Sequence, residues 1–168
     1  MYNLQVSIRK FNEKDILNKV KWINDSDNNK FLHYDLPLAY DKTLEWFLKI
    51  KDRKDRFDGI IEYDGNPVGI IGLLNIDLKN KKAEYYITLG EKQYRGKGIA
   101  YQASMEILKY AFHELELNKI YLYTETENIN AQKLFDKLGF IKEGLLKQDL
   151  IMNNQKKDRY IYAIFKNN

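Results

Sequence analysis

The sequence predicts an α/β or α+β domain with a mixed, mostly antiparallel sheet of six to seven strands and about four flanking helices. Segments of alternating or β-branched apolar residues are interspersed with segments whose apolar residues recur every three or four positions. Their order is strand, helices, three strands, helix, strand, helix and hairpin, which differs from the strict alternation of a doubly wound sheet. The 168 residues are enough for one domain with a full core, and we expect that domain to be 1–168.

A strand and two helices are expected to open the chain. The apolar positions of the first strand and the first helix are Leu4, Val6 and Ile8 at a spacing of two, then Ile16, Val20 and Ile23 at helical spacing. The second helix contains the apolar residues between Leu44 and Ile50. Asp41 or Thr43 is expected to cap it, because both side chains can accept a hydrogen bond from the first turn.

Three antiparallel strands should follow these helices. Residues 57–63 and 68–76 are rich in β-branched and aromatic side chains, and the Asp-Gly-Asn-Pro segment at 64–67 predicts a hairpin turn between them. A polar turn at 80–82 then leads to a third strand at 83–89.

The remaining elements alternate before a final hairpin. We expect a helix over 99–115, a strand over 119–126 and a helix over 131–138 that ends at Gly139 in the left-handed conformation. Two strands, 140–148 and 157–165, should pair around a turn at Asn153 and Asn154.

A basic turn with two glycines joins the strand at 83–89 to the helix that begins at 99. It reads Gln-Tyr-Arg-Gly-Lys-Gly-Ile-Ala over 93–100. Glycine permits backbone conformations closed to other residues, so successive N–H groups can face one anion at the positive end of the helix. The turn therefore predicts a phosphate site, with a simple tight corner as the alternative. It lacks the third glycine of a dinucleotide-binding turn and the Gly-Lys-Ser/Thr of a P-loop.

Two separate motifs resemble one superfamily. Gln93, Gly96 and Gly98 fit Gln-x-x-Gly-x-Gly, which resembles the pyrophosphate loop of the GNAT superfamily of acetyl-CoA-dependent N-acetyltransferases. Residues 128–140 resemble the Asn-x-x-Ala-x-x-Leu-Tyr-x-x-x-Gly-Phe segment of the same superfamily. The resemblance extends over nearly the whole chain. It implies a GNAT-like fold, acetyl-CoA as co-substrate and no metal.

The resemblance also implies which residues hold the cofactor. The pyrophosphate would lie at the glycine turn, and the pantetheine arm would pair like an extra strand with the backbone before it. The expected cofactor-binding residues are Ile87, Thr88, Leu89, Gln93, Arg95, Gly96, Lys97, Gly98, Ile99, Ala100 and Asn128. A plain turn role is the alternative for Asn128. Asn130 is expected to cap the helix at 131.

Catalysis by direct transfer needs a base, because an alkyl ammonium has a pKa of about 10.4. Glu84 is the expected base, acting through water, with a solvated or ion-paired edge residue as the alternative. Phe135 stands where many relatives have a tyrosine that protonates the thiolate. Three alternatives could replace this general acid. Another tyrosine, Tyr86, Tyr160 or Tyr162, could donate the proton; water could supply it; or the thiolate could leave unaided, because its thiol has a pKa of about 8.5. Of these, Tyr86 is the residue we expect to be catalytic beside Glu84.

The acceptor should be bound by the first third of the chain. Trp22, Asn24 and His33 are the expected substrate-binding residues, with a structural role as the alternative for His33. The segment around 22–32 resembles acetyltransferases acting on nucleotide-linked amino sugars, and spermidine and ribosomal-protein N-terminal acetyltransferases share the pattern. The net charge of +4 favours an acceptor that carries phosphate. We therefore expect an amino-sugar nucleotide or other small amine first, a protein N-terminus second and a polyamine third, with a non-catalytic acetyl-CoA-binding module as a further alternative.

Composition excludes several other classes. Without cysteine there are no disulfides, thiolate metal sites or cysteine nucleophile. The 28 basic and 24 acidic residues are interleaved, which favours a small anionic ligand over nucleic acid. Nothing has the pattern of a signal peptide or membrane span, so the expectation is a cytoplasmic protein without a membrane partner. The aromatic final strands are expected to supply core or a homodimer surface.

Overall fold

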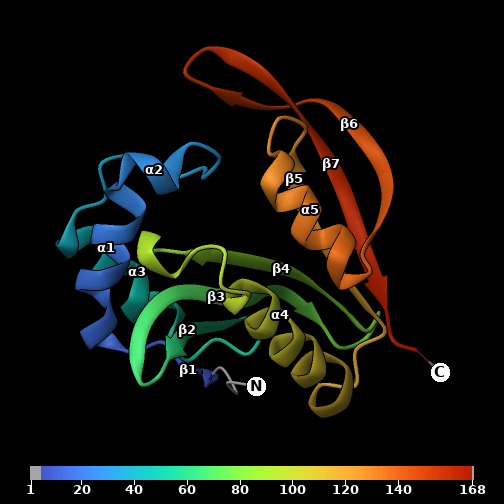
Figure 1. Ribbon diagram of the computed structural model, residues 1–168, viewed down its shortest axis with the longest axis horizontal. Helices are drawn as coiled ribbons and strands as arrows, with labels where there is room; N and C mark the ends of the chain where they lie inside the picture. The colour runs from blue at the N-terminus through green and yellow to red at the C-terminus, as the bar shows by residue number, and fades with distance from the viewer. Residues whose placement is uncertain (1–4, 168) are drawn as a thin grey trace.

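The computed structural model describes residues 5–167, and its elements follow the expected order (Figure 1). Leu4, expected in the first strand, lies outside the described residues. The strands are β1 (Val6–Lys10), β2 (Phe57–Tyr63), β3 (Asn66–Asp77), β4 (Lys82–Leu89), β5 (Lys119–Glu125), β6 (Ile141–Met152) and β7 (Gln155–Phe165). The helices are α1 (Ile16–Asn24), α2 (Ser26–Asn29), α3 (Tyr40–Ile50), α4 (Ile99–Lys109) and α5 (Ile129–Leu138), with the short 3-10 helices η1 (Glu13–Asp15) and η2 (Lys92–Tyr94) and the π-helix η3 (Tyr110–Glu114), which continues α4.

The strands form one seven-stranded sheet in the order β1-β2-β3-β4-β5-β7-β6. All neighbouring pairs are antiparallel except β4 and β5, which are parallel and connected through α4. The mixed, mostly antiparallel sheet expected from the sequence is thus confirmed. No helix within 5–167 has both the length and the apolar character needed to cross a bilayer.

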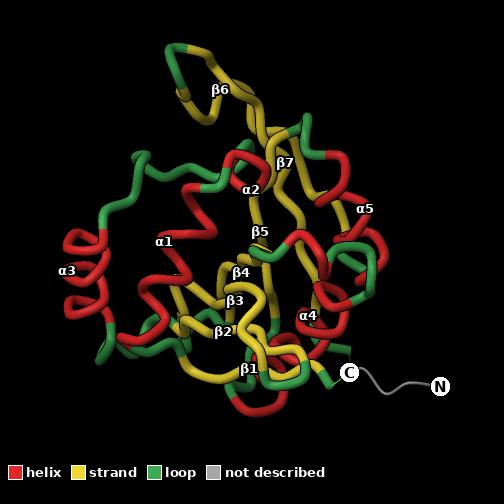
Figure 2. The backbone as a smooth tube through the Cα atoms, turned by 60° about the vertical axis from the view of Figure 1, so that its left-hand side comes forward, coloured by secondary structure: helices red, strands yellow, loops and turns green. Residues whose placement is uncertain are grey.

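Helices cover both faces of this sheet (Figure 2). Because successive strand residues point to opposite faces, neighbours on one strand belong to different cores. Ile61 and Ile71 pack with the core under α4 and α5, whereas Ile60 and Ile70 pack with the core under α1 and α3. The two-sided burial explains why β2 and β3 read as nearly continuous apolar runs.

The helix caps differ from the expected ones in two places. The N-cap of α3 is Ala39, and neither Asp41 nor Thr43 caps the helix; the Thr43 hydroxyl instead donates back to the Ala39 carbonyl at 2.8 Å. Helix α5 begins at Ile129 rather than 131, because the Asn128 side chain accepts from the Ala131 N–H at 3.3 Å. Asn128 therefore has the capping role expected of Asn130.

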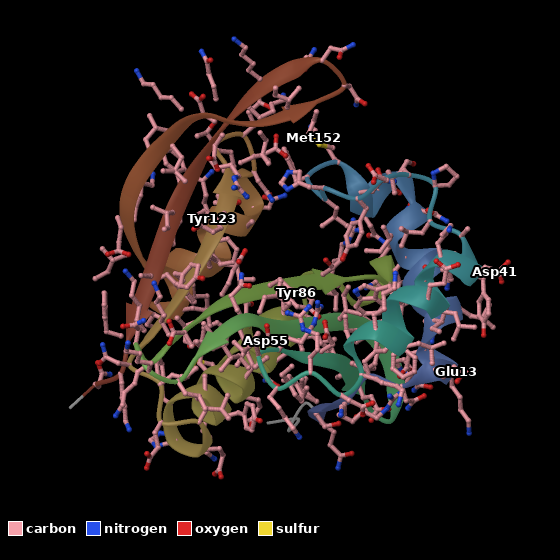
Figure 3. All side chains as sticks on the ribbon, turned by 180° about the vertical axis from the view of Figure 1, so that it is seen from behind. Glu13, Asp41, Asp55, Tyr86, Tyr123 and Met152 are labelled. Carbon is pink, nitrogen blue, oxygen red and sulfur yellow. The ribbon has the colours of Figure 1, made fainter. Side chains whose placement is uncertain are left out.

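Strands β4 and β5 separate soon after they meet. Their register pairs are Lys82 with Lys119, Ala83 with Ile120 and Glu84 with Tyr121. Beyond Glu84, β4 continues to pair with β3, and β5 continues to pair with β7. Figure 3 shows the two strands diverging, with Tyr86 on one and Tyr123 on the other. This divergence opens the sheet at the carboxyl ends of its parallel pair, where ligands of α/β proteins commonly bind.

The final hairpin is longer than expected. Strand β6 runs to Met152 and β7 starts at Gln155, so the two strands pair up to the Asn153–Asn154 turn. Both turn residues have positive φ, 49° and 61°. The hairpin projects beyond the helices in Figure 1.

Candidate active site

A cavity of about 530 Å³ lies where β4 and β5 diverge. One wall is β4 from Glu84 to Thr88, and the opposite wall is the end of β5 with the start of α5. The segment from Phe31 to Tyr34 closes the cavity from the side of the first helices. The topology therefore brings residues from several distant parts of the chain around one space.

Glu84 lies at the point where the two strands separate. Its side chain is half-buried, and Asn75 Nδ2 donates to its Oε2 at 3.1 Å. Burial raises the pKa of Glu84 above its ordinary value of 4.5, and the Asn75 hydrogen bond and the positive charge of Arg159 oppose this shift. Within residues 5–167 no cation forms an ion pair with it, so the alternative of an ion-paired edge residue is not observed. A carboxylate with a raised pKa beside a cavity has the properties of a general base.

Tyr86 lines the cavity, but its hydroxyl is engaged elsewhere. It donates to Asp58 Oδ1 at 2.6 Å. Burial, followed by the charge of Asp58, raises the pKa of Tyr86 well above 10. A phenol that holds its proton more tightly is a weaker acid, so this geometry does not favour the expected role of Tyr86 in protonating the thiolate.

The two other tyrosines considered as acids do not line the cavity. Tyr162 is 1% exposed and packs in the core, where burial raises its pKa. The ring of Tyr160 faces Lys142 Nζ at 3.7 Å. Phe135 does line the cavity, and its ring packs against Tyr85 and Tyr162. Two of the earlier alternatives therefore remain: the thiolate leaves unaided, or it takes a proton from water.

The glycine turn leaves the start of α4 open to a ligand. Gly96 and Gly98 have φ values of 73° and 79°, a conformation that costs other residues about 1–2 kcal/mol. Gly98 is the N-cap, and no side chain caps the first turn of α4. The N–H groups there lack the partner that Asn128 gives to α5. An uncapped helix start on a glycine turn is suited to bind a phosphate group.

The charged residues of the turn are held in different ways. Arg95 is tied to α2 through the Asn28 side chain and the Asp27 carbonyl. The Lys97 ammonium lies 5.4 Å from the ring centre of Tyr94 and the residue is exposed. Gln93 Nε2 donates to Glu91 Oε2 at 3.4 Å. Lys97 is thus free to move toward an anion, whereas Arg95 mainly fixes the turn against α2.

The remaining cofactor candidates lie on the two walls. Ile87 and Thr88 line the cavity, and their backbone pairs with β3 on one side while the side toward β5 is unpaired in the described chain. Leu89, the last residue of β4, pairs in register with Gly69 of β3. Asn128 also lines the cavity, with its Oδ1 used by the α5 cap and its Nδ2 left for a ligand.

Two of the three expected substrate-binding residues are structural. Trp22 is 1% exposed, packs on Gly90 and donates from Nε1 to Glu91 at 2.7 Å. Asn24 bonds both the N–H and the carbonyl of Leu38, at 2.7 and 3.0 Å, and so closes the loop between them. Neither lines the cavity, so the structure does not bring these two expected residues to the site.

His33 is the expected substrate residue that does reach the cavity. Its Nε2 lies 2.9 Å from Oε2 of Glu125, which is 5% exposed at the end of β5. The pair connects the segment after α2 to the opposite wall of the cavity. Sequence analysis did not identify Glu125, because nothing local shows that it faces a histidine 92 positions away.

Asp58 and Arg56 are further cavity residues that sequence analysis missed. Asp58 is 7% exposed and pairs with Arg56 at 2.6 Å. The sequence did contain a signal for Asp58. It lies two residues before Ile60, and therefore on the same face of a strand that is buried on both faces, where an unpaired carboxylate would be unusual. Among residues 5–167 no cluster of three His, Asp or Glu side chains has the arrangement of a metal site.

Comparison with known proteins agrees with this geometry. The family described as Acetyltransferase (GNAT) domain matches residues 5–141. The putative ribosomal N-acetyltransferase YdaF of Bacillus subtilis is 36% identical over 106 residues, 62% of this chain and 56% of that protein. The spermidine N(1)-acetyltransferase of Escherichia coli (strain K12) is 28% identical over 95% of this chain and 86% of its own.

A solved structure extends the similarity to the fold. The spermidine N-acetyltransferase of Vibrio cholerae in complex with CoA and spermine superposes with a TM-score of 0.89 and 25% identity. The match covers 96% of this chain and 95% of that one. Sheet order, open strand pair and glycine turn therefore agree with the family match, and the chain belongs to the GNAT family as an acetyl-CoA-dependent N-acetyltransferase.

Proposed function

We propose that this acetyltransferase acetylates a primary amine of a small aliphatic di- or polyamine. The observation that carries the proposal is the distribution of charge in the cavity: Glu84 has no ion-pair partner in the described chain, whereas the arginines that line the cavity are paired with other carboxylates. The relatives named for spermidine, one of them bound to spermine, support the same class of acceptor. The net positive charge of the chain had favoured a phosphate-bearing amino sugar, and the distribution of charge in the cavity replaces that argument.

The cations that line the cavity are not available to a phosphate. Arg56 pairs with Asp58 at 2.6 Å, and Arg159 pairs with a β6 aspartate at 2.6 Å. Lys19 is 6% exposed, lies 3.3 Å from the centre of the Trp46 ring, and burial lowers its pKa to about 8. A sugar nucleotide carries two phosphates that need free cations, so it fits this cavity poorly.

The available charge in the cavity is negative. Glu84 is free of ion pairs in the described chain, and Glu125 shares its charge with His33 alone. Aromatic side chains of Phe31 and Tyr123 line the same space. Carboxylates and aromatic faces are the groups that attract an alkyl ammonium.

Glu84 performs the proton transfer in this scheme. It accepts a proton from the substrate ammonium through a water molecule, and the neutral nitrogen attacks the carbonyl carbon of the thioester. An unpaired N–H of β4 in the stretch at Ile87 and Thr88 donates to the oxyanion. Collapse of the intermediate breaks the carbon–sulfur bond and releases CoA thiolate. The second proton of the nitrogen leaves to solvent, and no covalent bond to the enzyme forms.

Thiol release with acetyl-CoA tests the proposal against a panel of acceptors. We expect kcat/KM for spermidine to exceed that for a UDP-linked amino sugar and for a peptide with a free N-terminus by at least about tenfold, the effect of about 1.4 kcal/mol in acceptor recognition. A higher kcat/KM for the amino sugar would overturn the polyamine assignment. CoA binding without thiol release from any acceptor would favour the non-catalytic module instead.

A protein N-terminus is the second candidate acceptor. It rests on the similarity to YdaF, whose printed name is that of a putative ribosomal N-acetyltransferase. The same assay distinguishes it, because a peptide acceptor would then have the higher kcat/KM.

We also propose that the protein self-associates through the β6–β7 hairpin. Ile141, Leu145 and Ile151 are 62%, 45% and 71% exposed there, and one relative of known structure is described as dodecameric. Light scattering after size exclusion should give a mass above the 20.1 kDa of one chain. An Ile151→Glu variant should lower that mass, and a monomeric wild type would contradict the proposal.

A further inference from the structure

A second cavity, of about 410 Å³, lies at the opposite end of the sheet from the glycine turn. The end of β1, the start of β2 and the end of β3 surround it, together with the C-terminal end of α3. Its interior is apolar and rich in aromatic rings. The residues that form this interior are Phe11, Phe47, Ile50, Phe57, Ile76 and Tyr110.

The rim of this cavity is basic. Its cationic residues are Lys10, Lys51, Arg53, Lys54 and Arg56, and Asp58 is the acidic residue among the described lining. Two further carboxylates stand next to the rim, Asp52 paired with Lys51 and Asp55 paired with Arg53. Five positive charges thus meet three negative ones, which leaves an excess of two.

The excess lies on Lys10 and Lys54. The Lys10 ammonium donates to the Lys51 carbonyl at 3.2 Å, and neither lysine forms an ion pair within residues 5–167. Both side chains are exposed. Both ammonium groups act on Asp52 through their charge, but that carboxylate is already paired with Lys51. A rim with this excess of positive charge at the mouth of an apolar cavity complements a molecule with an anionic head and an apolar tail.

The two cavities share a wall. Arg56 and Asp58 line both of them. On the active-site side, Asp58 accepts the hydroxyl of Tyr86 at 2.6 Å. A molecule in the second cavity would therefore contact the ion pair that forms part of the acceptor-binding wall.

We propose that this cavity, between the end of α3 and η3, is a binding site for a small amphipathic carboxylate, with Lys10 and Lys54 holding the carboxylate and Phe47, Phe57 and Tyr110 contacting an aliphatic or aromatic tail. This site is separate from the acetyl-CoA cleft and does not depend on the identity of the acceptor amine.

Calorimetric titration with 4-phenylbutyrate, on protein saturated with CoA, tests the site. The neutral 4-phenylbutanol has the same tail without the charge, so it reports the apolar contribution alone. We expect the acid to bind at least about tenfold more tightly than the alcohol, as two charge-assisted contacts would give. Equal affinity of acid and alcohol, or no binding of the acid, would overturn the proposal.

Three variants locate the binding. The double substitution Lys10→Gln with Lys54→Gln should weaken binding of the acid about tenfold and leave the alcohol unchanged. Leu78→Glu adds a carboxylate at the mouth, on a residue that is 65% exposed, and should also weaken the acid. Lys49→Gln is the matched control, because Lys49 is an exposed lysine of α3 outside the lining. Thermal melting checks that each variant is folded. If the folded double variant and the folded Leu78→Glu variant both bind the acid as tightly as the wild type does, the assignment is contradicted.

Discussion

The two walls of the active-site cleft differ in how far their polar groups are satisfied. On the β5 wall, β5 pairs with β7 along its length, Asn128 caps α5, and Glu125 bonds His33. On the β4 wall, the strand lacks a partner toward β5 beyond Glu84, and α4 starts on Gly98 without a side-chain cap.

From this difference we expect the β5 wall to stabilise the fold and the β4 wall to bind the reactants. Unpaired N–H groups, an uncapped helix and a carboxylate without a counterion each cost stability when nothing binds them. In the proposed function, acetyl-CoA and the amine would supply the missing partners on the β4 wall. The β5 wall is already complete, so we expect substitutions there to affect stability more than turnover.

Removing the carboxylate of Glu84 should have the largest effect. We expect Glu84→Gln to lower kcat by about 100-fold or more with little change in KM, because proton removal loses its base. In the wild type kcat should fall as the pH drops through the pKa of Glu84, which burial has raised above 4.5, and the variant should lose this acid limb. Steady-state kinetics from pH 4.5 to 9 measure both effects.

Glu114→Gln provides the control, because Glu114 is exposed and lies outside the cavity. Its kcat should equal that of the wild type. A Glu84→Gln enzyme with full rate and an unchanged pH profile would show that Glu84 is not the base.

Changing the open helix start should weaken the cofactor. We expect Gly98→Ala to raise the KM for acetyl-CoA about tenfold with kcat at saturation unchanged, because alanine disfavours the φ of 79° that aims the N–H groups. Gly65→Ala is the matched control, because Gly65 has a φ of 77° and, like Gly98, has room for a Cβ. Both variants should lose similar stability, and a KM that rises equally in both would contradict a phosphate role for the turn.

Asn128 tests the capped helix on the other wall. Asn128→Ala should lower the free energy of unfolding by about 1 kcal/mol through loss of the cap. Asn128→Asp keeps an accepting oxygen, so it should keep this stability while losing the Nδ2 donor. We expect the KM for acetyl-CoA to rise about threefold in both variants, a modest loss for one neutral hydrogen bond. Unchanged KM in Asn128→Asp would limit the residue to capping. Urea unfolding and initial rates provide the two measurements.

The smallest effect is expected at Phe135. Phe135→Tyr places a hydroxyl where other family members have an acid, yet a thiol with a pKa of about 8.5 gives a leaving group that needs little help. We expect kcat to change by less than about threefold. A tenfold gain would mean that protonation of the thiolate limits the native enzyme.

Local sequence patterns were sufficient for the order of the elements and for the conformation of the glycine turn. The strands at 57–63 and 83–89 were predicted from their apolar periodicity, because alternation is set by the backbone itself. Gly96 and Gly98 were predicted from the conformational freedom of glycine, and both have positive φ. Gly139 likewise ends α5 with a φ of 92°.

Long-range contacts decided the rest of the site. The sequence did not reveal that the Tyr86 hydroxyl donates to Asp58, because Asp58 lies 28 positions away. Trp22 was taken for a substrate residue, although its indole is buried against the segment after β4.

The sequence by itself determined the order of elements, the family and the position of the glycine turn before α4, because each depends on neighbours within a few residues. The tertiary structure decided where β4 and β5 part, which cavity cations are neutralised, and that Glu84 is half-buried without an ion-pair partner among residues 5–167. Those properties arise from pairing between distant strands and from burial, and no local pattern encodes either one.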